Sequence, residues 1–200
     1  LGDGRVFCSN ETFKVMNIRR GKASRTGFLS DVELLDAGHV VGSKMLLYKD
    51  ELLYTGDVCT RDRFFLKGAE PVKARKLIIE STFGDPNYSF PPLEKIIKQV
   101  KNWVKENPRT IWFGYPFGKS QVLTALANHL GITPYAAGEV SKYNELVPCL
   151  EYRNMNESVL EKDEFVVVAP TSLKKAFPSE VMRAMGISSA YFSGWAMSWN

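Results

Sequence analysis

Three side chains that can bind a metal ion stand at or just after the ends of apolar segments, namely His39, Asp57 and Glu80. Imidazole nitrogen and carboxylate oxygen both suit zinc or manganese. Open α/β sheets usually bind ligands at the carboxyl ends of their strands, and a polar residue that closes an apolar segment falls at such an end. The three positions therefore predict a candidate metal site at one edge of a sheet.

The segments 43–48 and 52–54 predict a β-hairpin joined by a three-residue turn. If the turn is centred on Asp50, two residues that face each other across the hairpin have residue numbers that sum to about 100. Ser43 then faces Asp57. The loop that holds His39 lies at the same end of the hairpin. The register therefore predicts that one imidazole and one carboxylate meet there.

Both faces of this hairpin are apolar, with Met45 and Leu47 on one side and Leu46 and Tyr48 on the other. Such a pattern is typical of strands that other elements cover above and below. The apolar segment 76–80 likewise predicts a buried strand that ends in its glutamate. We therefore expect these strands to lie inside the protein.

The residues alone leave other roles open for the same side chains. His39 also fits a loop histidine, and Asp57 fits a turn or cap residue. Glu80 could pair with Arg75 or cap the turn that follows it. A zinc site needs three or four protein ligands, whereas the second histidine of the chain, His129, falls in a predicted helix.

Five short motifs, in this order along the chain, resemble segments of one nuclease family. They are Ala37-Gly38-His39-Val40-Val41-Gly42-Ser43, Tyr54-Thr55-Gly56-Asp57, Ile78-Ile79-Glu80-Ser81-Thr82-Phe83-Gly84, Phe113-Gly114-Tyr115-Pro116-Phe117-Gly118-Lys119-Ser120-Gln121 and Ser193-Gly194-Trp195. The chain resembles the metallo-β-lactamase-fold nucleases with a β-CASP insertion. Within that family it is similar to archaeal predicted exonucleases akin to mRNA 3′-end processing factors, and to bacterial ligase-associated exonucleases.

The resemblance implies a fold. Residues 1–85 would form part of a metallo-β-lactamase αββα sandwich, and residues 86–200 would form most of a β-CASP domain, which is a parallel α/β domain. The expected fold class is therefore α/β.

The resemblance also implies a chemistry. His39 and Asp57 would be metal ligands for a pair of divalent ions, zinc or alternatively manganese, and Asp57 would bridge the two ions. Asp57 and Glu80 would be the catalytic residues, with Glu80 supporting the site. The implied reaction is metal-dependent hydrolysis of phosphodiester bonds in RNA or single-stranded DNA, of the RNA 3′-end processing type.

The sequence departs from the family at two places. The HxHxDH motif, which supplies most of the family's metal ligands, would precede Gly4 and is absent from this sequence. An SDHAD-like segment expected soon after Trp195 is absent as well. We therefore expect the chain to be catalytically incomplete. The alternative hypothesis is a non-catalytic chain that binds nucleic acid or acts as a scaffold.

A strand, a glycine loop and a Lys-Ser pair within 109–120 indicate a remote alternative, a P-loop NTPase. A phosphate-binding loop needs four residues between its first glycine and Gly-Lys, whereas Gly114 and Gly118 enclose three. The apolar strand 165–170 also lacks the terminal aspartate that would hold magnesium. The spacing argues against an NTPase, although amides near Lys119 could still bind a nucleic-acid phosphate.

Cations near these motifs are candidate contacts for the phosphates of a substrate. They are Arg61, Arg63 and Lys119. The net charge of +4 permits a nucleic-acid partner without requiring one.

From residue 93 onward, helical and strand patterns alternate. Helices are predicted at 93–106 and 119–130, and strands at 109–113, 165–170 and 187–192. This alternation predicts a small parallel α/β domain.

The composition of the 200-residue chain indicates an ordinary globular protein. Its three cysteines form no CxxC pair, which favours reduced thiols and a cytoplasmic location. No apolar run approaches the ~20 residues of a membrane span, and no signal-peptide pattern opens the chain, so we expect no membrane partner. The sequence is compatible with a homodimer.

Overall fold

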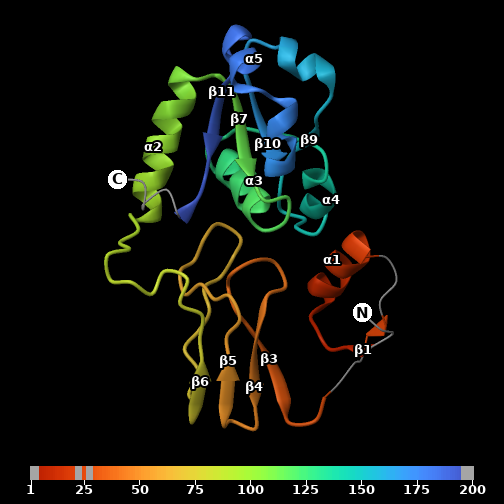
Figure 1. The fold of residues 1–200 in the computed structure, drawn as a ribbon, viewed down its shortest axis with the longest axis vertical. Helices are drawn as coiled ribbons and strands as arrows, with labels where there is room; N and C mark the ends of the chain where they lie inside the picture. The colour runs from red at the N-terminus through yellow and green to blue at the C-terminus, as the bar shows by residue number, and fades with distance from the viewer. Residues whose placement is uncertain (1–4, 21–23, 26–28, 195–200) are drawn as a thin grey trace. The chain divides into compact units, whose positions relative to one another are not determined.

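The computed structural model describes residues 5–20, 24–25 and 29–194. The chain divides into two compact units, Leu1–Gly84 and Asp85–Asn200, each with a main sheet of its own (Figure 1). The predicted α/β class is confirmed, because helices accompany both antiparallel and parallel strands. The assignment of the units to a metallo-β-lactamase sandwich and a β-CASP domain stays a prediction. Trp195, which ends the last motif, lies outside the described residues.

The main sheet of the first unit has the strand order β3-β4-β5-β6. Its strands are β3 (Val32–Asp36), β4 (Lys44–Tyr48), β5 (Leu52–Tyr54) and β6 (Lys76–Ile78). β3, β4 and β5 are antiparallel, whereas β6 pairs with β5 in parallel. Leu47 faces Leu53 and Tyr48 faces Leu52, so the predicted hairpin register is confirmed.

Helix α1 (Asn10–Arg20) precedes this sheet and begins at a serine cap. The Oγ atom of Ser9 accepts the backbone N–H of Thr12 at 3.0 Å, which satisfies one of the donors that the first turn of a helix leaves unpaired. Two short parallel strands flank the helix in sequence, β1 (Arg5–Val6) and β2 (Ser24–Arg25).

One face of the main sheet is buried. Met45 and Leu47 of β4 and Leu53 of β5 pack in a buried cluster with Ala37 and Ala69. These strand residues share a face because side chains alternate along a strand and the register aligns the two strands.

The opposite face and the edge of this sheet are exposed. Tyr48 and Tyr54 are 40% and 51% exposed, so the prediction that the hairpin is covered on both faces is wrong for the described residues. The prediction of a buried strand at 76–80 is also wrong, because Leu77 and Ile78 are 57% and 52% exposed. β6 is the edge strand of the sheet and pairs, among the described strands, with β5 alone. An apolar pattern does not reveal whether a covering element is present.

The second unit is built on a parallel sheet with the strand order β11-β7-β10-β8-β9. Its strands are β7 (Arg109–Gly114), β8 (Tyr135–Ala136), β9 (Arg153–Asn154), β10 (Phe165–Pro170) and β11 (Ser188–Tyr191). The helices are α2 (Leu93–Glu106), α3 (Lys119–His129), α4 (Val140–Asn144) and α5 (Ser179–Ala184), with 3₁₀ turns η1 (Glu157–Glu161) and η2 (Thr171–Ala176). The predicted parallel arrangement is confirmed. None of the helices in the described residues has both the length and the apolar character needed to cross a bilayer.

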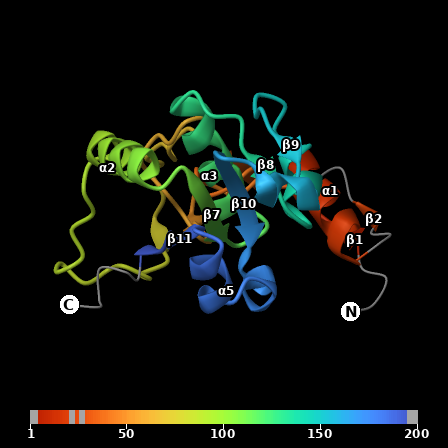
Figure 2. The same cartoon turned by 90° about the horizontal axis from the view of Figure 1, so that it is seen from above.

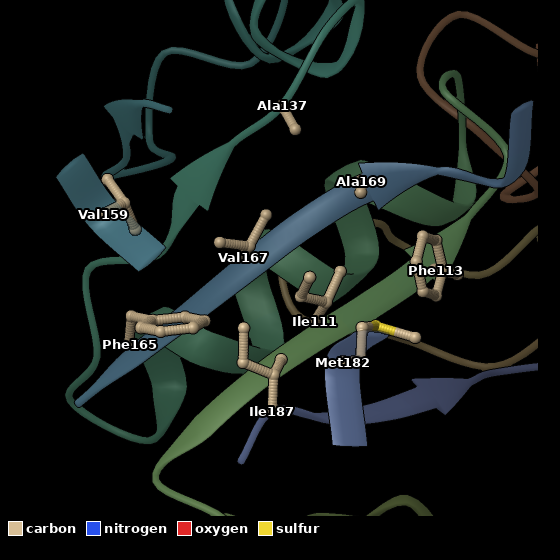
Figure 3. Packing of buried hydrophobic residues seen from close by; sticks show 9 residues of the cluster. All are labelled: Ile111, Phe113, Ala137, Val159, Phe165, Val167, Ala169, Met182 and Ile187. Atoms are coloured by element: carbon tan, nitrogen blue, oxygen red, sulfur yellow. The ribbon is translucent and has the colours of Figure 1, made fainter. Parts of the chain in front are cut away.

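Helices lie on both faces of the parallel sheet, with α3 on one side and α5 on the other (Figure 2). Alternate residues of the two central strands form the core on the α5 side, where Ile111 and Phe113 of β7 join Phe165 and Val167 of β10 (Figure 3). Met182 of α5 belongs to the same buried cluster. Apolar residues on both faces of β7 and β10 therefore reflect helices on both sides.

A buried polar network joins α3 to α4. The Gln121 side chain donates to Oδ1 of Asn144 at 2.9 Å and accepts the N–H of Gly118 at 2.7 Å. Asn144 donates to Oγ1 of Thr124 at 3.3 Å, and the Thr124 hydroxyl donates to the carbonyl of Ser120 at 2.9 Å. The network fixes the loop before α3 and the position of α4 through one set of buried partners.

Replacing Asn144 with alanine should lower the free energy of unfolding by about 1–3 kcal/mol, because the buried amide of Gln121 loses an acceptor. Urea unfolding measures the change. Asn102→Ala is the matched control, since Asn102 is exposed on α2 and its loss should be close to neutral. Equal effects of the two substitutions would contradict a stabilising role for the network.

Candidate metal site

The hairpin register brings His39 and Asp57 together, as predicted. Nε2 of His39 lies 3.9 Å from Oδ2 of Asp57, and the side chains are 41% and 73% exposed. In a tetrahedral zinc site with bonds of about 2.1 Å, two ligand atoms lie about 3.4 Å apart. The observed separation is close to this value, so the two side chains fit neighbouring positions of a metal site.

The loop that carries His39 is closed by Ser43, a residue that the sequence interpretation did not include in the site. The Oγ atom of Ser43 accepts the N–H groups of His39 at 3.2 Å and Val40 at 3.1 Å. Gly38 has a φ of +65°, and a Cβ at this position would lie 2.4 Å from the carbonyl oxygen of Cys59. The loop therefore requires glycine before the histidine and a short hydroxyl side chain after it.

The start of α1 holds the other end of the same loop. The hydroxyls of Ser9 and Thr12 donate to the carbonyl of Gly42 at 2.7 and 2.9 Å. Gly42 has a φ of +75°, and a Cβ there would lie 2.6 Å from Cβ of Glu11. The helix start and the loop therefore pack without room for a side chain between them.

Arg63 also holds the His39 loop, and its predicted contact with a phosphate stays a prediction. Its Nη2 group donates to the carbonyls of Gly38 at 2.7 Å and His39 at 2.8 Å. The side chain reaches these atoms because the chain turns back after Arg63, where Phe64 has a φ of +52° and Leu66 bridges to Arg63. The guanidinium is thus engaged within the protein and positions the backbone that carries the imidazole.

Glu80 caps the turn after β6, and the charge of His39 also acts on its carboxylate. Its Oε2 accepts the N–H of Thr82 at 2.8 Å, and this bond is the main reason why the pKa of the Glu80 carboxyl lies below its ordinary value. A backbone hydrogen bond from Val58 and the charge of His39 lower the pKa further. The capping role that the sequence left open is therefore present, and the carboxylate lies within electrostatic range of the His39 imidazole.

The described residues contain no group of three His, Cys, Asp or Glu side chains placed to hold one metal ion. His39 and Asp57 therefore fit part of a metal site and do not complete one by themselves. His129 lies in α3 of the second unit. Arg75, considered as a partner for Glu80, lies 4.0 Å from the carboxylate of Glu51.

The other two predicted substrate contacts lie in different units. Arg61 is exposed in the segment that follows Asp57. Lys119 is the first residue of α3, and its stem covers Gly114, where an added Cβ would lie 2.8 Å from Cγ of Lys119. Their predicted contacts with phosphate stay predictions.

No family model matches the chain. The chain is 29% identical over 182 residues to a probable DNA ligase of Opitutus terrae, an alignment that covers 83% of this chain and 17% of the relative. It is 31% identical over 141 residues to the DNA cross-link repair 1A protein of Gallus gallus, covering 64% of this chain and 14% of the relative. The protein of the same name from Mus musculus is 33% identical over 113 residues, covering 50% and 11%. The chain thus spans less than a fifth of the length of these relatives.

A solved structure shares the fold at low sequence identity. It is the crystal structure of a protein of unknown function from Enterococcus faecalis V583, with a TM-score of 0.57 and 12% identity. The match covers 95% of this chain and 64% of that protein's chain. The similarity concerns the α/β fold.

Arg63→Ala should lower the free energy of unfolding by roughly 1.5–3 kcal/mol, because two backbone carbonyls lose a charged donor in a partly buried place. Arg61→Ala is the matched control and should be nearly neutral, since that side chain is exposed. Urea unfolding of both variants measures the difference. A neutral Arg63→Ala would show that the two hydrogen bonds do not stabilise the loop.

The lowered pKa of Glu80 predicts a pH-dependent contribution to stability. A carboxyl whose folded pKa is depressed stabilises the protein above its unfolded pKa, near the ordinary value of 4.5, and loses this contribution as the pH falls through the folded pKa. Wild type should therefore exceed Glu80→Gln in stability by more at pH 7 than at about pH 3. Urea unfolding at several pH values measures the gap, and a gap independent of pH would contradict the prediction.

Proposed function

We propose that this chain forms part of a metal-dependent nuclease that hydrolyses phosphodiester bonds in nucleic acid. The observation that carries the proposal is the 3.9 Å separation between Nε2 of His39 and Oδ2 of Asp57 at the end of the hairpin. The names of the relatives, a probable DNA ligase and DNA cross-link repair 1A proteins, support an activity on nucleic acid. The activity belongs to a longer protein if the missing ligands lie on other segments.

Each residue of the candidate site would have a separate task. His39 and Asp57 would bind divalent metal ions, zinc or alternatively manganese, with Asp57 shared between two of them. Such ions lower the pKa of water and stabilise negative charge on a phosphate. Glu80 is ionised at neutral pH because its pKa is low, so it would act as a hydrogen-bond acceptor that orients a ligand or a water molecule.

Single-stranded DNA or RNA is the proposed substrate. The relatives' names refer to DNA, which favours DNA over the RNA 3′-end processing role that the sequence motifs imply. Arg61, Arg63 and Lys119 are the proposed phosphate contacts. A panel of matched RNA and DNA strands distinguishes the two substrates by their rates of cleavage.

A second candidate function is non-catalytic binding of nucleic acid. It is favoured by the incomplete set of ligands among the described residues. In that case the chain would bind strands in a salt-sensitive way without cleaving them.

A P-loop NTPase is poorly supported, because the loop before α3 uses its amides internally. The N–H of Gly118 donates to the side chain of Gln121, and the N–H of Ser120 donates to the carbonyl of Tyr115. β10 ends in Pro170, which offers no carboxylate for magnesium. Because these two hydrogen bonds occupy the N–H groups of Gly118 and Ser120, fewer amides near Lys119 remain to bind a phosphate.

Asp57→Asn should abolish metal-dependent cleavage and reduce bound metal, because the substitution replaces a charged ligand oxygen. The measurements are metal content by elemental mass spectrometry and cleavage of labelled strands with zinc or manganese. Asp50→Asn is the matched control, since Asp50 lies in the hairpin turn with a φ of +54° that asparagine tolerates.

Bound metal and cleavage that Asp57→Asn removes and Asp50→Asn keeps would support the nuclease. Binding of strands without metal or cleavage would favour the second candidate function. Cleavage that persists in Asp57→Asn would overturn the proposed role of this residue.

A further inference from the structure

Two exposed tyrosines stand side by side at the carboxyl edge of the parallel sheet. Tyr115 follows β7 and is 64% exposed, and Tyr191 ends β11 and is 47% exposed. β7 and β11 are neighbours in parallel, and Tyr191 is paired with Phe113, two residues before Tyr115. The two rings therefore leave the sheet from adjacent strands at the same edge.

The tyrosine pair is held by contacts that leave the rings accessible. Partial burial and the neighbouring Tyr115 side chain raise the pKa of the Tyr191 hydroxyl. The carbonyl of Tyr115 accepts the Ser120 hydroxyl at 2.8 Å and its N–H at 3.2 Å, so the start of α3 fixes the backbone below the ring. Little conformational freedom would be lost if a flat ligand stacked on these rings.

The part of this edge formed by β11, β7 and β10 is positively charged. The segments that follow β8 and β9 at the same edge carry Glu139 and Glu157. The segments that follow the three neighbouring strands β7, β10 and β11 are 115–119, 171–176 and 192–194. Together they carry three lysines and no acidic residue: Lys119, Lys174 and Lys175. The stem of Lys119 lies against the backbone of Gly114, the residue before Tyr115. An anionic ligand with flat groups therefore complements this surface better than an apolar protein segment does.

The topology also points to this edge. β7 and β10 are adjacent, but the chain leaves β7 through α3 on one face and leaves β10 through α5 on the other (Figure 2). Ligands of open parallel sheets usually bind at the carboxyl ends of the strands where the connections diverge in this way. Gly114 and Pro170, the last residues of the two strands, are paired there.

We propose that this edge binds a single strand of nucleic acid, with bases stacked on Tyr115 and Tyr191 and a backbone phosphate at Lys119. Stacking on aromatic side chains tolerates any base sequence, because every base presents a flat face. The inference rests on the proposed function for its choice of substrate class, and it adds a binding surface that lies outside the candidate metal site.

The test is fluorescence anisotropy of a labelled oligothymidylate of about twelve nucleotides, with EDTA present so that no cleavage occurs. Tyr115→Ala and Tyr191→Ala should each weaken binding roughly 5- to 100-fold. Tyr115→Phe and Tyr191→Phe should keep most of the affinity, because they retain the ring. Tyr48→Ala is a control at an exposed tyrosine of the first unit and should leave binding unchanged.

An abasic strand of the same length tests stacking without any variant, since it offers the same phosphates and no bases. It should bind wild type about as weakly as the thymidylate strand binds the alanine variants. Equal affinity of wild type for both strands, or an unchanged affinity in the two alanine variants, would overturn the proposal. Self-association that Tyr115→Ala removes, with no binding of strands, would assign the surface to a second copy of the chain instead.

The assay separates this inference from the nuclease proposal, because it contains no metal. Base-dependent binding without any cleavage in the metal assay would retain the stacking surface and reject the nuclease. Cleavage that depends on Asp57, with no contribution from the tyrosines to binding, would reject the stacking surface alone.

Discussion

The antiparallel register of β4 against β5 is the constraint on which the candidate metal site depends. Leu47 and Leu53 face each other within the buried cluster of the first unit. A slip of one residue would turn such leucines toward solvent, and each fully buried side chain of this kind contributes about 1.5–3 kcal/mol. The packing that selects the register therefore also sets the separation between His39 and Asp57, although neither residue belongs to the core.

The His39 loop is held through its backbone. The hydroxyl of Ser43 and the guanidinium of Arg63 bond to backbone atoms of the loop, and Gly38 brings it close to the carbonyl of Cys59. These contacts would persist if the imidazole were replaced, so the position of a metal ligand and its chemistry depend on different residues. Such contacts support a ligand on a loop, where sites are otherwise held less precisely than on helices or strands.

Much of the fold could be predicted from the sequence because its signals are local. Helical spacing predicted α2 at 93–106 and an apolar run predicted β10, both with the bounds that the structure has. The role of Arg63 could not be predicted, because its contact with Gly38 joins residues 25 apart in sequence. The exposure of β6 was missed for the same reason, since burial depends on elements that the strand itself does not specify.

The candidate metal site and the tyrosine pair would contribute to different parts of a reaction. Stacking on Tyr115 and Tyr191 is the same in the ground state and in the transition state, so it would strengthen binding without lowering the barrier. Ligands such as His39 and Asp57 act where charge develops on the phosphate, so they would act on the rate of the chemical step. A chain with an incomplete set of ligands can therefore retain affinity for a strand while losing turnover, and binding by itself does not distinguish a nuclease from a scaffold.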